Sequence, residues 1–418
     1  MSLTVPEANW RHVPVRLDVE RWATRRTRRR VLVVVHTVIA GRRLLDVTRL
    51  LEGDIRVQLI FTQAPDVFSN GVPEFLERLG ALVLPWSQAV QTEFDLALAA
   101  GHGSLHDLTA PVVVLPHGAG HNKLAPAASH GRTASPPGVY GLSRQRLIRD
   151  GAVVPEAIVL AHHEELTRLG RECPEALPVA EVVGDPCFDR VMASLPSRAL
   201  YRQSLTVEAR QRLILVCSTW GPDSLLGQGW EILERLVAEL PGDDYRIAAL
   251  LHPHIWNAHG ELQVRTWLAG LARSGLILIS PHGEWAGAVV AADQIVADHG
   301  SVSLYGAMTG APMLMAGRPD AKVDPSSPMA ELMSFTPRLR PERPMCPQIK
   351  RSSTNRHAVR YERVAARITS EPGRFARRMR ALLYRKLRLR APALRTATEP
   401  ARLPLTVRFD EPGSGVPR

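Results

Sequence analysis

The sequence predicts an α/β protein built from two doubly wound, Rossmann-like domains in tandem. Short apolar runs of strand length alternate with longer amphipathic stretches, which is the pattern of parallel sheets covered by helices. This alternation runs from Val31 to about residue 183, breaks near Pro186 and starts again at Leu213. A chain of 418 residues with 45% hydrophobic content is long enough to bury two such cores.

The first domain is expected to open with Val31–Val35, a continuous apolar run that suits a parallel strand buried on both faces. A helix is predicted over residues 42–51. Further strands are predicted at Val57–Phe61, Ala81–Leu84, Leu96–Ala99, Val112–Leu115, Ala157–Leu160 and Val179–Val183.

The second domain is expected to follow an arginine-rich helix over residues 198–210. Its strands are predicted at Leu213–Cys217, Tyr245–Leu251, Leu276–Ile279, Gln294–Ala297 and Pro312–Met315. Its helices are predicted at Ser224–Glu239, Gly260–Ala272, Glu284–Ala291 and Ser301–Thr309.

The charge is unevenly divided along the chain. Residues 336–418 hold 21 Lys and Arg against 6 Asp and Glu, so the basic character belongs to the tail. The proline-rich stretch 337–347 is expected to end the second domain, and residues 392–418 are expected to be mostly disordered. The predicted parts are a basic N-terminal segment, an N-terminal domain, a C-terminal domain and a basic tail, at residues 1–30, 31–190, 191–335 and 336–418.

An amphipathic helix is predicted near the end of this tail. Residues 374–390 contain eight basic residues and no acidic one. The apolar residues at helical spacing are Phe375, Met379, Leu382, Leu383 and Leu387. Three interpretations stay open: the helix docks on the body of the protein, lies on an anionic membrane surface, or contacts nucleic acid. Nucleic acid is the least favoured partner because the tail has few aromatic residues for base stacking.

The rest of the composition indicates a cytoplasmic protein, with peripheral membrane association left open through the tail. No apolar run approaches the length of a membrane span, and the first 20 residues lack a signal-peptide core. The four cysteines are widely spaced and match no zinc-binding pattern.

Polar turns follow most of the predicted strands. Open α/β sheets bind ligands at the carboxyl ends of their strands, and histidine titrates near neutral pH. In the first domain these turns contain His36 and Thr37, His102, His117 and His121. In the second domain they are Ser218-Thr219-Trp220-Gly221, His252-Pro253-His254, Pro281-His282-Gly283-Glu284 and Asp298-His299-Gly300-Ser301. Any one of these histidines can instead be a packed or capping imidazole.

The last of these turns has the features of a phosphate-binding site. A helix that opens at Gly300-Ser301 directs unpaired backbone N–H groups and its positive dipole end at a ligand. Gly300 permits close approach, and the hydroxyls of Ser301 and Ser303 can add donors. The histidines lack metal-ligand spacing, and neither a Walker A motif nor GxGxxG after the first strand is present.

These motifs carry a family resemblance. The segments are Pro116–Gly118, Val183–Asp189, Ser218–Leu225, His252-Pro253 and Ala297–Ser301. Together they resemble the CDP-glycerol glycerophosphotransferase family and, more distantly, the non-hydrolysing UDP-N-acetylglucosamine 2-epimerases. The family turn Asp-Tyr-Ser-Ser stands here as Asp298–Ser301, and Trp-His-Gly-Thr stands as Pro116–Ala119.

The resemblance implies GT-B architecture, in which two Rossmann-like domains face a cleft. It also implies a CDP- or UDP-linked donor held mainly by the second domain and a hydroxyl acceptor reaching in from the first, with no cofactor and no metal strictly required. Phosphoryl and glycosyl transfer stay open. The alternatives are an epimerase-like enzyme on the same fold and a nucleotide-binding protein without catalysis.

Roles follow for the strand-end residues. We expect His117 to act as the general base and His252 as a second catalytic group that donates a hydrogen bond. The acceptor side is expected at His36, Thr37, His102 and His121. The donor site is expected at Ser218, Thr219, Trp220, Gly221, His252, His282, Asp298, His299, Gly300, Ser301 and Ser303.

Overall fold

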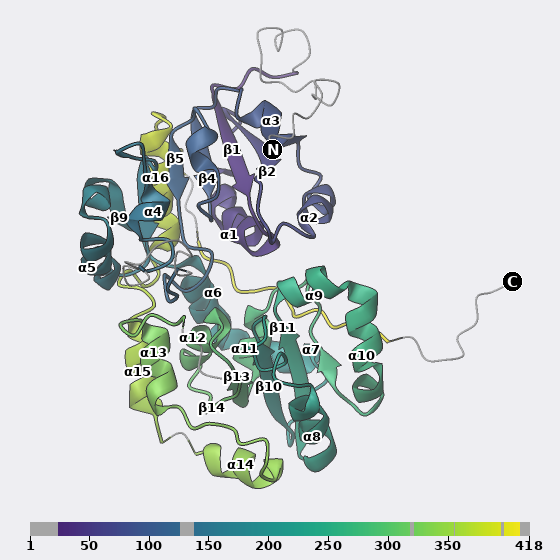
Figure 1. The fold of residues 1–418 in the computed structure, drawn as a ribbon. Coiled ribbons are helices and arrows are strands. Elements are labelled where there is room, and N and C mark those ends of the chain that lie inside the picture. Colours follow the sequence, from purple (N-terminus) through teal and green to yellow (C-terminus); the bar gives the residue numbers. More distant parts are fainter. Residues whose placement is uncertain (1–23, 126–137, 318–321, 355, 394–396, 410–418) are drawn as a thin grey trace, which may run out of the picture. The chain divides into compact units, whose positions relative to one another are not determined.

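The computed structural model describes residues 24–125, 138–317, 322–354, 356–393 and 397–409 (Figure 1). The chain forms two compact units. Unit 1 contains Met1–Pro186 and Thr369–Ala397, and unit 2 contains Cys187–Ile368 and Thr398–Arg418. Most of the predicted basic segment at residues 1–30 lies outside the described residues.

Unit 1 is built on a seven-stranded parallel sheet in the order β3-β2-β1-β4-β5-β8-β9. Each predicted strand of this half of the chain is confirmed. The strands are β1 Arg29–Val35, β2 Val57–Gln63, β3 Val83–Leu84, β4 Leu96–Ala99, β5 Val112–Val114, β8 Ala157–Leu160 and β9 Ala180–Val182. The antiparallel pair β6 Ile148–Arg149 and β7 Ala152–Val153 was not predicted; its Asp150-Gly151 turn has positive φ at both residues.

Strand β1 is buried on both faces, as its continuous apolar run predicts. Val31, Val33 and Val35 join a cluster that contains residues of α1 Val38–Thr48 and α2 Val72–Arg78. Leu32 and Val34 join a second cluster on the other face, which includes part of α3 Trp86–Ala89. The helices α4 Arg144–Leu147 and α5 His163–Glu172 complete this part of unit 1, and α6 Pro186–Ser194 begins where it ends.

Unit 2 repeats the plan with a five-stranded parallel sheet in the order β12-β11-β10-β13-β14. Its strands also lie where the sequence predicts them: β10 Arg212–Ser218, β11 Tyr245–Leu251, β12 Ile277–Leu278, β13 Gln294–Ala297 and β14 Met313–Met315. Its helices are α7 Arg198–Ser204, α8 Glu231–Glu239, α9 Pro253–His259, α10 Glu261–Arg273, α11 Ala286–Ala291, α12 Ser301–Ala307, α13 Pro328–Phe335, α14 Met345–Ser352 and α15 Ala358–Ala366.

The expected tail at residues 336–418 is not a separate part of the molecule. The proline-rich stretch does not end the second domain, because Met315 donates its N–H to the carbonyl of Pro337 and Leu339 donates to the carbonyl of Met315. This segment therefore extends the edge of the unit 2 sheet beyond β14. Helices α14 and α15 follow it within the same unit.

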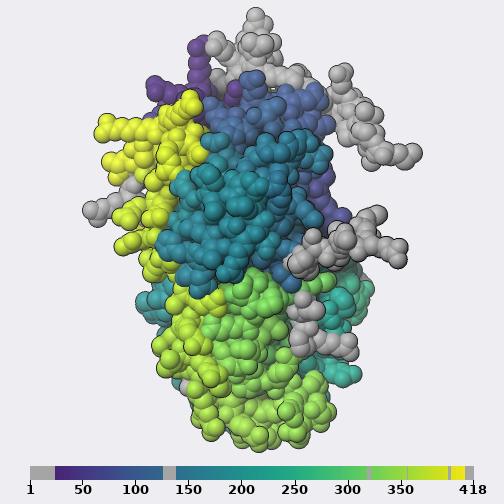
Figure 2. Space-filling view, turned by 60° about the vertical axis from the view of Figure 1, so that its left-hand side comes forward, coloured from purple at the N-terminus to yellow at the C-terminus, as the bar shows by residue number. Residues whose placement is uncertain are grey.

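Helix α16, Phe375–Lys386, packs its apolar stripe into the core of unit 1. Figure 2 shows this yellow segment lying along the surface of that unit. Met379, Leu382 and Leu383 are completely buried in the same cluster as Val31 and Leu44. The Tyr384 hydroxyl donates to Asp54 Oδ2 at 2.8 Å. The interpretation of a docked helix is therefore correct.

The basic face of α16 is also partly neutralised within unit 1. Lys386 Nζ lies 2.9 Å from Glu156 Oε1, and Arg385 pairs with Glu181. Arg374 and Arg378 both contact the Glu371 carboxylate. The apolar stripe is thus buried against unit 1, which corrects the expectation that it lies on a membrane surface. Within the described ranges, no helix is both long and apolar enough to cross a membrane.

The chain beyond α16 also has order that the sequence did not predict. Residues 398–409 lie in unit 2, where Ser280 donates its N–H to the Leu405 carbonyl and Val407 donates its N–H to the Leu278 carbonyl. The Tyr201 hydroxyl donates to the carbonyl of Ala401 at 2.7 Å. Extended backbone covers the β12 edge, and the expected disorder of residues 392–418 is wrong for this part. Residues 394–396 and 410–418 lie outside the description.

Docking of α16 makes a testable stability prediction. Leu382→Ala removes a completely buried side chain and is expected to lower the unfolding free energy of unit 1 by about 2–5 kcal/mol. Arg377→Ala, at an exposed position on the same helix, should change it by less than about 0.5 kcal/mol. Denaturant titration followed by circular dichroism measures both. Equal midpoints for the two variants would contradict the docked helix.

Candidate functional site

Parallel pairing places three polar strand ends of unit 2 next to one another. Ser218 at the end of β10 is level with Leu251 at the end of β11, and Cys217 is level with Ala297 at the end of β13. The residues that come next are Thr219, His252 and Asp298. The sequence pattern that placed polar turns at strand ends therefore brings these three turns to one edge of the sheet.

The Asp298 carboxylate organises this edge. It is 1% exposed and accepts hydrogen bonds from the backbone N–H groups of Thr219 (2.9 Å), Leu225 (2.9 Å) and Gly300 (3.1 Å). Burial raises the pKa of Asp298, and the N–H donors together with His299 oppose that rise. Asp298 thus holds the turn after β10 against the turn after β13, and does not itself point a charge at a ligand.

Helix α12 begins immediately after this carboxylate. Gly300 is its N-cap. The N–H groups of Ser301 and Val302 lie in the first turn and have no acceptor within the helix. A Cβ at Gly300 would lie 3.2 Å from Thr219 Cβ and 3.4 Å from Asp298 Oδ1. Glycine is needed here for close approach, since its φ of −76° is ordinary. The N–H groups of half-exposed Ser301 and Val302 are the part of the predicted phosphate site that remains, because the Gly300 N–H already donates to Asp298.

His252 has a defined tautomer when neutral. Its Nδ1 accepts the N–H of His254 at 3.1 Å and so caps α9, which leaves the ring proton on Nε2. The half-buried imidazole can therefore donate from Nε2, as predicted. The Trp220 ring lies 4.5 Å from the His254 ring and 6.4 Å from the His252 ring, so the turns after β10 and β11 share an aromatic contact.

The other expected donor-site residues have varied positions. Ser218 and Ser303 are buried, and the Ser303 hydroxyl donates to the Asp298 carbonyl at 2.6 Å, so a phosphate contact from Ser303 would break that bond. His299 is buried. Gly221 has φ +92° and forms the bend after Trp220. His282 is exposed and its Nε2 lies 3.1 Å from Glu261 Oε2, and no described contact joins it to the Asp298 turn.

In unit 1, His117 lies in the turn after β5. Its Nδ1 lies 3.2 Å from the Ala100 carbonyl, which fixes the ring proton on Nδ1 and leaves a lone pair on Nε2. The side chain is exposed. Desolvation by neighbouring protein atoms holds the pKa of His117 below its ordinary value, and the charge of Arg43 adds to this, although the Ala100 hydrogen bond acts the other way. The neutral ring has the form that a general base requires.

Arg43 holds the His117 turn in place. This α1 side chain is 4% exposed, donates from Nη2 to the Gly118 carbonyl at 3.0 Å and pairs with Asp185 Oδ2 at 3.3 Å. Sequence reasoning missed Arg43. Its signal was an arginine on the apolar side of the first helix, directly before Leu44 and Leu45.

His121 forms a buried pair with Glu165 of α5. Its Nδ1 lies 2.8 Å from Glu165 Oε1, which also accepts the His121 N–H. Burial alone would raise the pKa of Glu165, but His121 and Arg168 lower it to about 2. Glu165 therefore stays ionised and orients His121 with its Nε2 toward Gly141, where a Cβ would lie 2.9 Å away. Glu165 was also missed by sequence reasoning.

The remaining acceptor-side residues are mainly structural. Thr37 caps α1, with its Oγ1 accepting the Ala40 N–H at 3.1 Å. His36 is buried and its Nε2 lies 2.8 Å from the Gly103 carbonyl; burial lowers its pKa. Desolvation and neighbouring positive charge lower the pKa of His102 to about 3, and its Nδ1 has no hydrogen-bond partner among the described residues. These histidines are neutral near pH 7.

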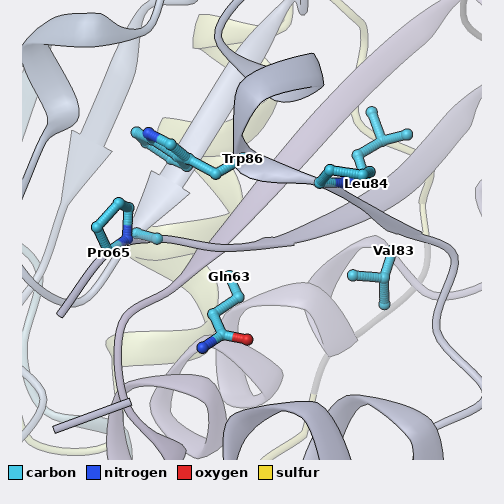
Figure 3. A pocket seen from close by; sticks show the side chains of 7 residues that line it. Gln63, Pro65, Val83, Leu84 and Trp86 are labelled. Carbon is cyan, nitrogen blue, oxygen red and sulfur yellow. The ribbon is translucent and has the colours of Figure 1, made fainter. Parts of the chain in front are cut away.

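Unit 1 has a pocket at the carboxyl ends of β2 and β3. Its volume is about 320 Å³, and Figure 3 shows the side chains of Gln63, Pro65 and Trp86 around it. The Pro65 carbonyl lies 3.4 Å from the position of a Cβ at Gly103, so the pocket borders the loop that His36 holds. An indole and an amide are groups that bind sugars and polyols. Within the described part of the chain, no cluster of His, Cys, Asp or Glu can hold a metal ion.

Comparison with solved structures supports the fold. The wall teichoic acid polymerase TagF is similar with a TM-score of 0.56 and 14% identity, over 86% of this chain and 89% of that chain. A TagF variant soaked with CDPG gives a TM-score of 0.55 and 14% identity, over 87% and 90%. HepE of Anabaena in complex with UDP-glucose gives 0.44 and 14%, over 86% and 95%. No protein-family model matches the sequence, and no curated protein matches it. The two Rossmann-like units are of GT-B type, which confirms the predicted fold class.

The Arg43–Asp185 pair gives a second prediction. Arg43→Met leaves a buried carboxylate without its partner and is expected to cost about 3–5 kcal/mol of stability. The double variant Arg43→Met/Asp185→Leu should recover most of this, because it removes both buried charges. Arg49→Met, at an exposed position just beyond α1, is the control. Chemical denaturation measures all three. A double variant no more stable than Arg43→Met would show that the pair is not the cause.

Proposed function

We propose that the protein is a GT-B-type transferase that uses a CDP- or UDP-linked donor and a hydroxyl acceptor. The observation that carries this proposal is the start of α12, where the N–H groups of half-exposed Ser301 and Val302 follow a turn held by Asp298. Backbone donors at a helix start, with a glycine that permits close approach, suit a diphosphate. The resemblance to glycerophosphotransferases and the fold shared with TagF support the same reaction class.

In this proposal unit 2 binds the donor. The diphosphate contacts the N–H groups of Ser301 and Val302 and the Ser301 hydroxyl, and Gly300 lets it approach the backbone closely. His252 donates from Nε2, because its Nδ1 is occupied by the α9 cap. Trp220 and Thr219 border the same turn and contact the diphosphate or the base. No metal is needed for these contacts, since backbone dipoles and a ring N–H supply the positive potential.

Unit 1 supplies the proton acceptor and binds the hydroxyl acceptor. His117 Nε2 takes the proton of the acceptor hydroxyl as its oxygen attacks. If the attacked atom is the distal phosphorus, the P–O bond to a nucleoside monophosphate breaks; if it is an anomeric carbon, the C–O bond to a nucleoside diphosphate breaks. In either case the leaving group keeps the bonding electrons, and the start of α12 stabilises its charge. The pocket of Gln63 and Trp86 supports a polyol or glycan acceptor.

The epimerase alternative loses support from the contacts of its candidate carboxylates. Asp185 is paired with Arg43, and Asp298 accepts three backbone N–H groups. Glu284 accepts the N–H of Arg402. Asp185 and Asp298 are therefore occupied by structural contacts, whereas the Arg402 N–H is the single hydrogen-bond donor to Glu284 among the described residues.

A nucleotide-binding protein without catalysis is the second candidate. The observation that favours it is the use of the Gly300 N–H by Asp298, which leaves fewer donors for a transition state. Thermal-shift measurements with CDP and UDP species, followed by an assay for nucleotide release, separate the two functions. Stabilisation without release in the presence of polyol and glycan acceptors would favour the binding protein.

Gly300→Val tests the donor site. The added side chain would crowd Thr219 Cβ and the Asp298 carboxylate, so we expect loss of nucleotide affinity with the fold retained. Gly270→Val, at a position with open space in α10, is the matched control. Calorimetric titration with CDP and UDP measures the affinity. An unchanged affinity in Gly300→Val would remove α12 from the donor site.

His117→Ala tests the base. We expect turnover to fall by a factor of about 10²–10⁴ with donor affinity retained, since general-base catalysis is worth that much. Because the pKa of His117 is lowered, its ring stays neutral at pH values at which an ordinary histidine is protonated. The loss of turnover on acidification should therefore set in below about pH 6.5. His163→Ala, an exposed histidine at the start of α5, is the control. Full turnover of His117→Ala at saturating acceptor would exclude this role.

A further inference from the structure

Unit 2 has a second pocket, beside the amino-terminal half of β14. Its volume is about 480 Å³. Residues of β14, of the segment that extends the sheet edge at 337–347, and of α14 and α15 line it. Pro312 and Met313 lie where β14 begins, whereas the Asp298 turn follows the carboxyl end of β13. The pocket therefore belongs to a different part of unit 2 from the proposed donor site.

Positive charge dominates the lining of this pocket. The arginines that line it are Arg338, Arg340, Arg343, Arg351 and Arg356. No carboxylate is among its lining residues, and Glu342 in the same segment is exposed and outside the lining. Arg338 donates to the Gly317 carbonyl, and the other four guanidinium groups form no ion pair with a described residue. Arg363 and Arg367 of the same unit differ, because they share Glu331.

Gln348 of α14 fixes the backbone that carries two of these arginines. Its Oε1 accepts the Arg340 N–H at 2.9 Å, and its Nε2 lies 3.0 Å from the Arg340 carbonyl, 3.2 Å from the Arg343 carbonyl and 3.1 Å from the Pro344 carbonyl. Pro344 and Pro347 further limit the backbone. Arg340 and Arg343 thus project from a loop whose backbone is held without a ligand, which lowers the entropic cost of binding one.

The floor of the pocket is apolar and well packed. Met313, Leu314 and Tyr361 are buried, and the Tyr361 hydroxyl accepts the Met313 N–H at 3.3 Å. A concave site of this volume suits a compact ligand. A nucleic-acid strand would instead need an extended basic groove with exposed aromatic rings for stacking. Guanidinium groups bind phosphate oxygens in a bidentate manner.

We propose that this pocket binds a multiply charged phosphate group, either free or as the headgroup of a phosphorylated lipid. Four guanidinium groups without ion-pair partners repel one another, and a phosphate dianion placed among them removes that repulsion while the rigid loop keeps its shape. The inference does not rest on the proposed transferase function, because none of these residues belongs to the donor or acceptor site.

Inorganic tripolyphosphate is the first probe, titrated calorimetrically into the full chain. Arg340→Gln/Arg343→Gln/Arg351→Gln is expected to lower the association constant by about 10-fold or more, since charge-assisted hydrogen bonds are lost. The control Arg171→Gln/Arg273→Gln/Arg377→Gln removes the same charge from three exposed arginines elsewhere and should leave the affinity nearly unchanged. Gln348→Leu tests the positioning of the loop and should weaken binding while all five arginines remain.

Two further titrations test where the anion binds and which compound carries the phosphate. Gly300→Val should retain tripolyphosphate binding at the arginine pocket; if it abolishes binding while the pocket variant does not, the anion binds at α12 and the proposal is overturned. Dihexanoyl phosphatidic acid and glycerol 3-phosphate carry the same phosphomonoester and test its source: tighter binding of the phosphatidic acid assigns a lipid headgroup, and equal or weaker binding assigns a free phosphate. If the pocket variant and its charge-matched control lose equal affinity for tripolyphosphate, the loss comes from the change in net charge, and the proposal is overturned.

Discussion

The proposed donor site depends on one buried carboxylate. Parallel pairing brings the ends of β10 and β13 together, but each strand then leaves the sheet through a turn with unpaired backbone N–H groups. Asp298 accepts hydrogen bonds from Thr219, Leu225 and Gly300, and so converts two independent turns into one rigid surface. A carboxylate buried to 1% exposure is tolerated only because these donors replace its water. The start of α12 is presented to solvent as a consequence of that arrangement.

In unit 1 an ion pair holds the corresponding polar turn in place. The turn that carries His117 is held through its Gly118 carbonyl by Arg43, and Asp185 neutralises the arginine. Glu165 does the same for His121. In both units a buried charge positions the polar turn, and the group that faces solvent is a neighbour of that charge. Residues that look like ligands in the sequence are therefore often the supports of the site.

This distinction limits what the sequence can predict. All twelve strands of the two large sheets lie where apolar runs of strand length predict them, because burial on both faces leaves a strong one-dimensional signal. The roles of Thr37, Ser303 and Asp298 could not be read in that way, since a helix cap, a buried hydroxyl and a ligand contact require the same residue types. Arg43 and Asp185 are 142 positions apart in the chain, and only the folded unit brings them together. The docking of α16 was undecided for the same reason: its stripe fits any apolar surface, and the cluster around Val31 and Leu44 is the one that covers it.

The two units differ in the charge of the polar groups at their strand ends. In unit 1 desolvation lowers the pKa values of His36, His102 and His117, so these imidazoles are neutral near pH 7. None of the three supplies a positive charge there, because each would have to gain a proton against its surroundings. In unit 2 the positive potential comes from groups that cannot lose it near neutral pH, namely backbone N–H dipoles at α12 and guanidinium groups beside β14. The proposed transferase needs a base that stays unprotonated, assigned here to His117, and an anion site of permanent charge, assigned here to the start of α12.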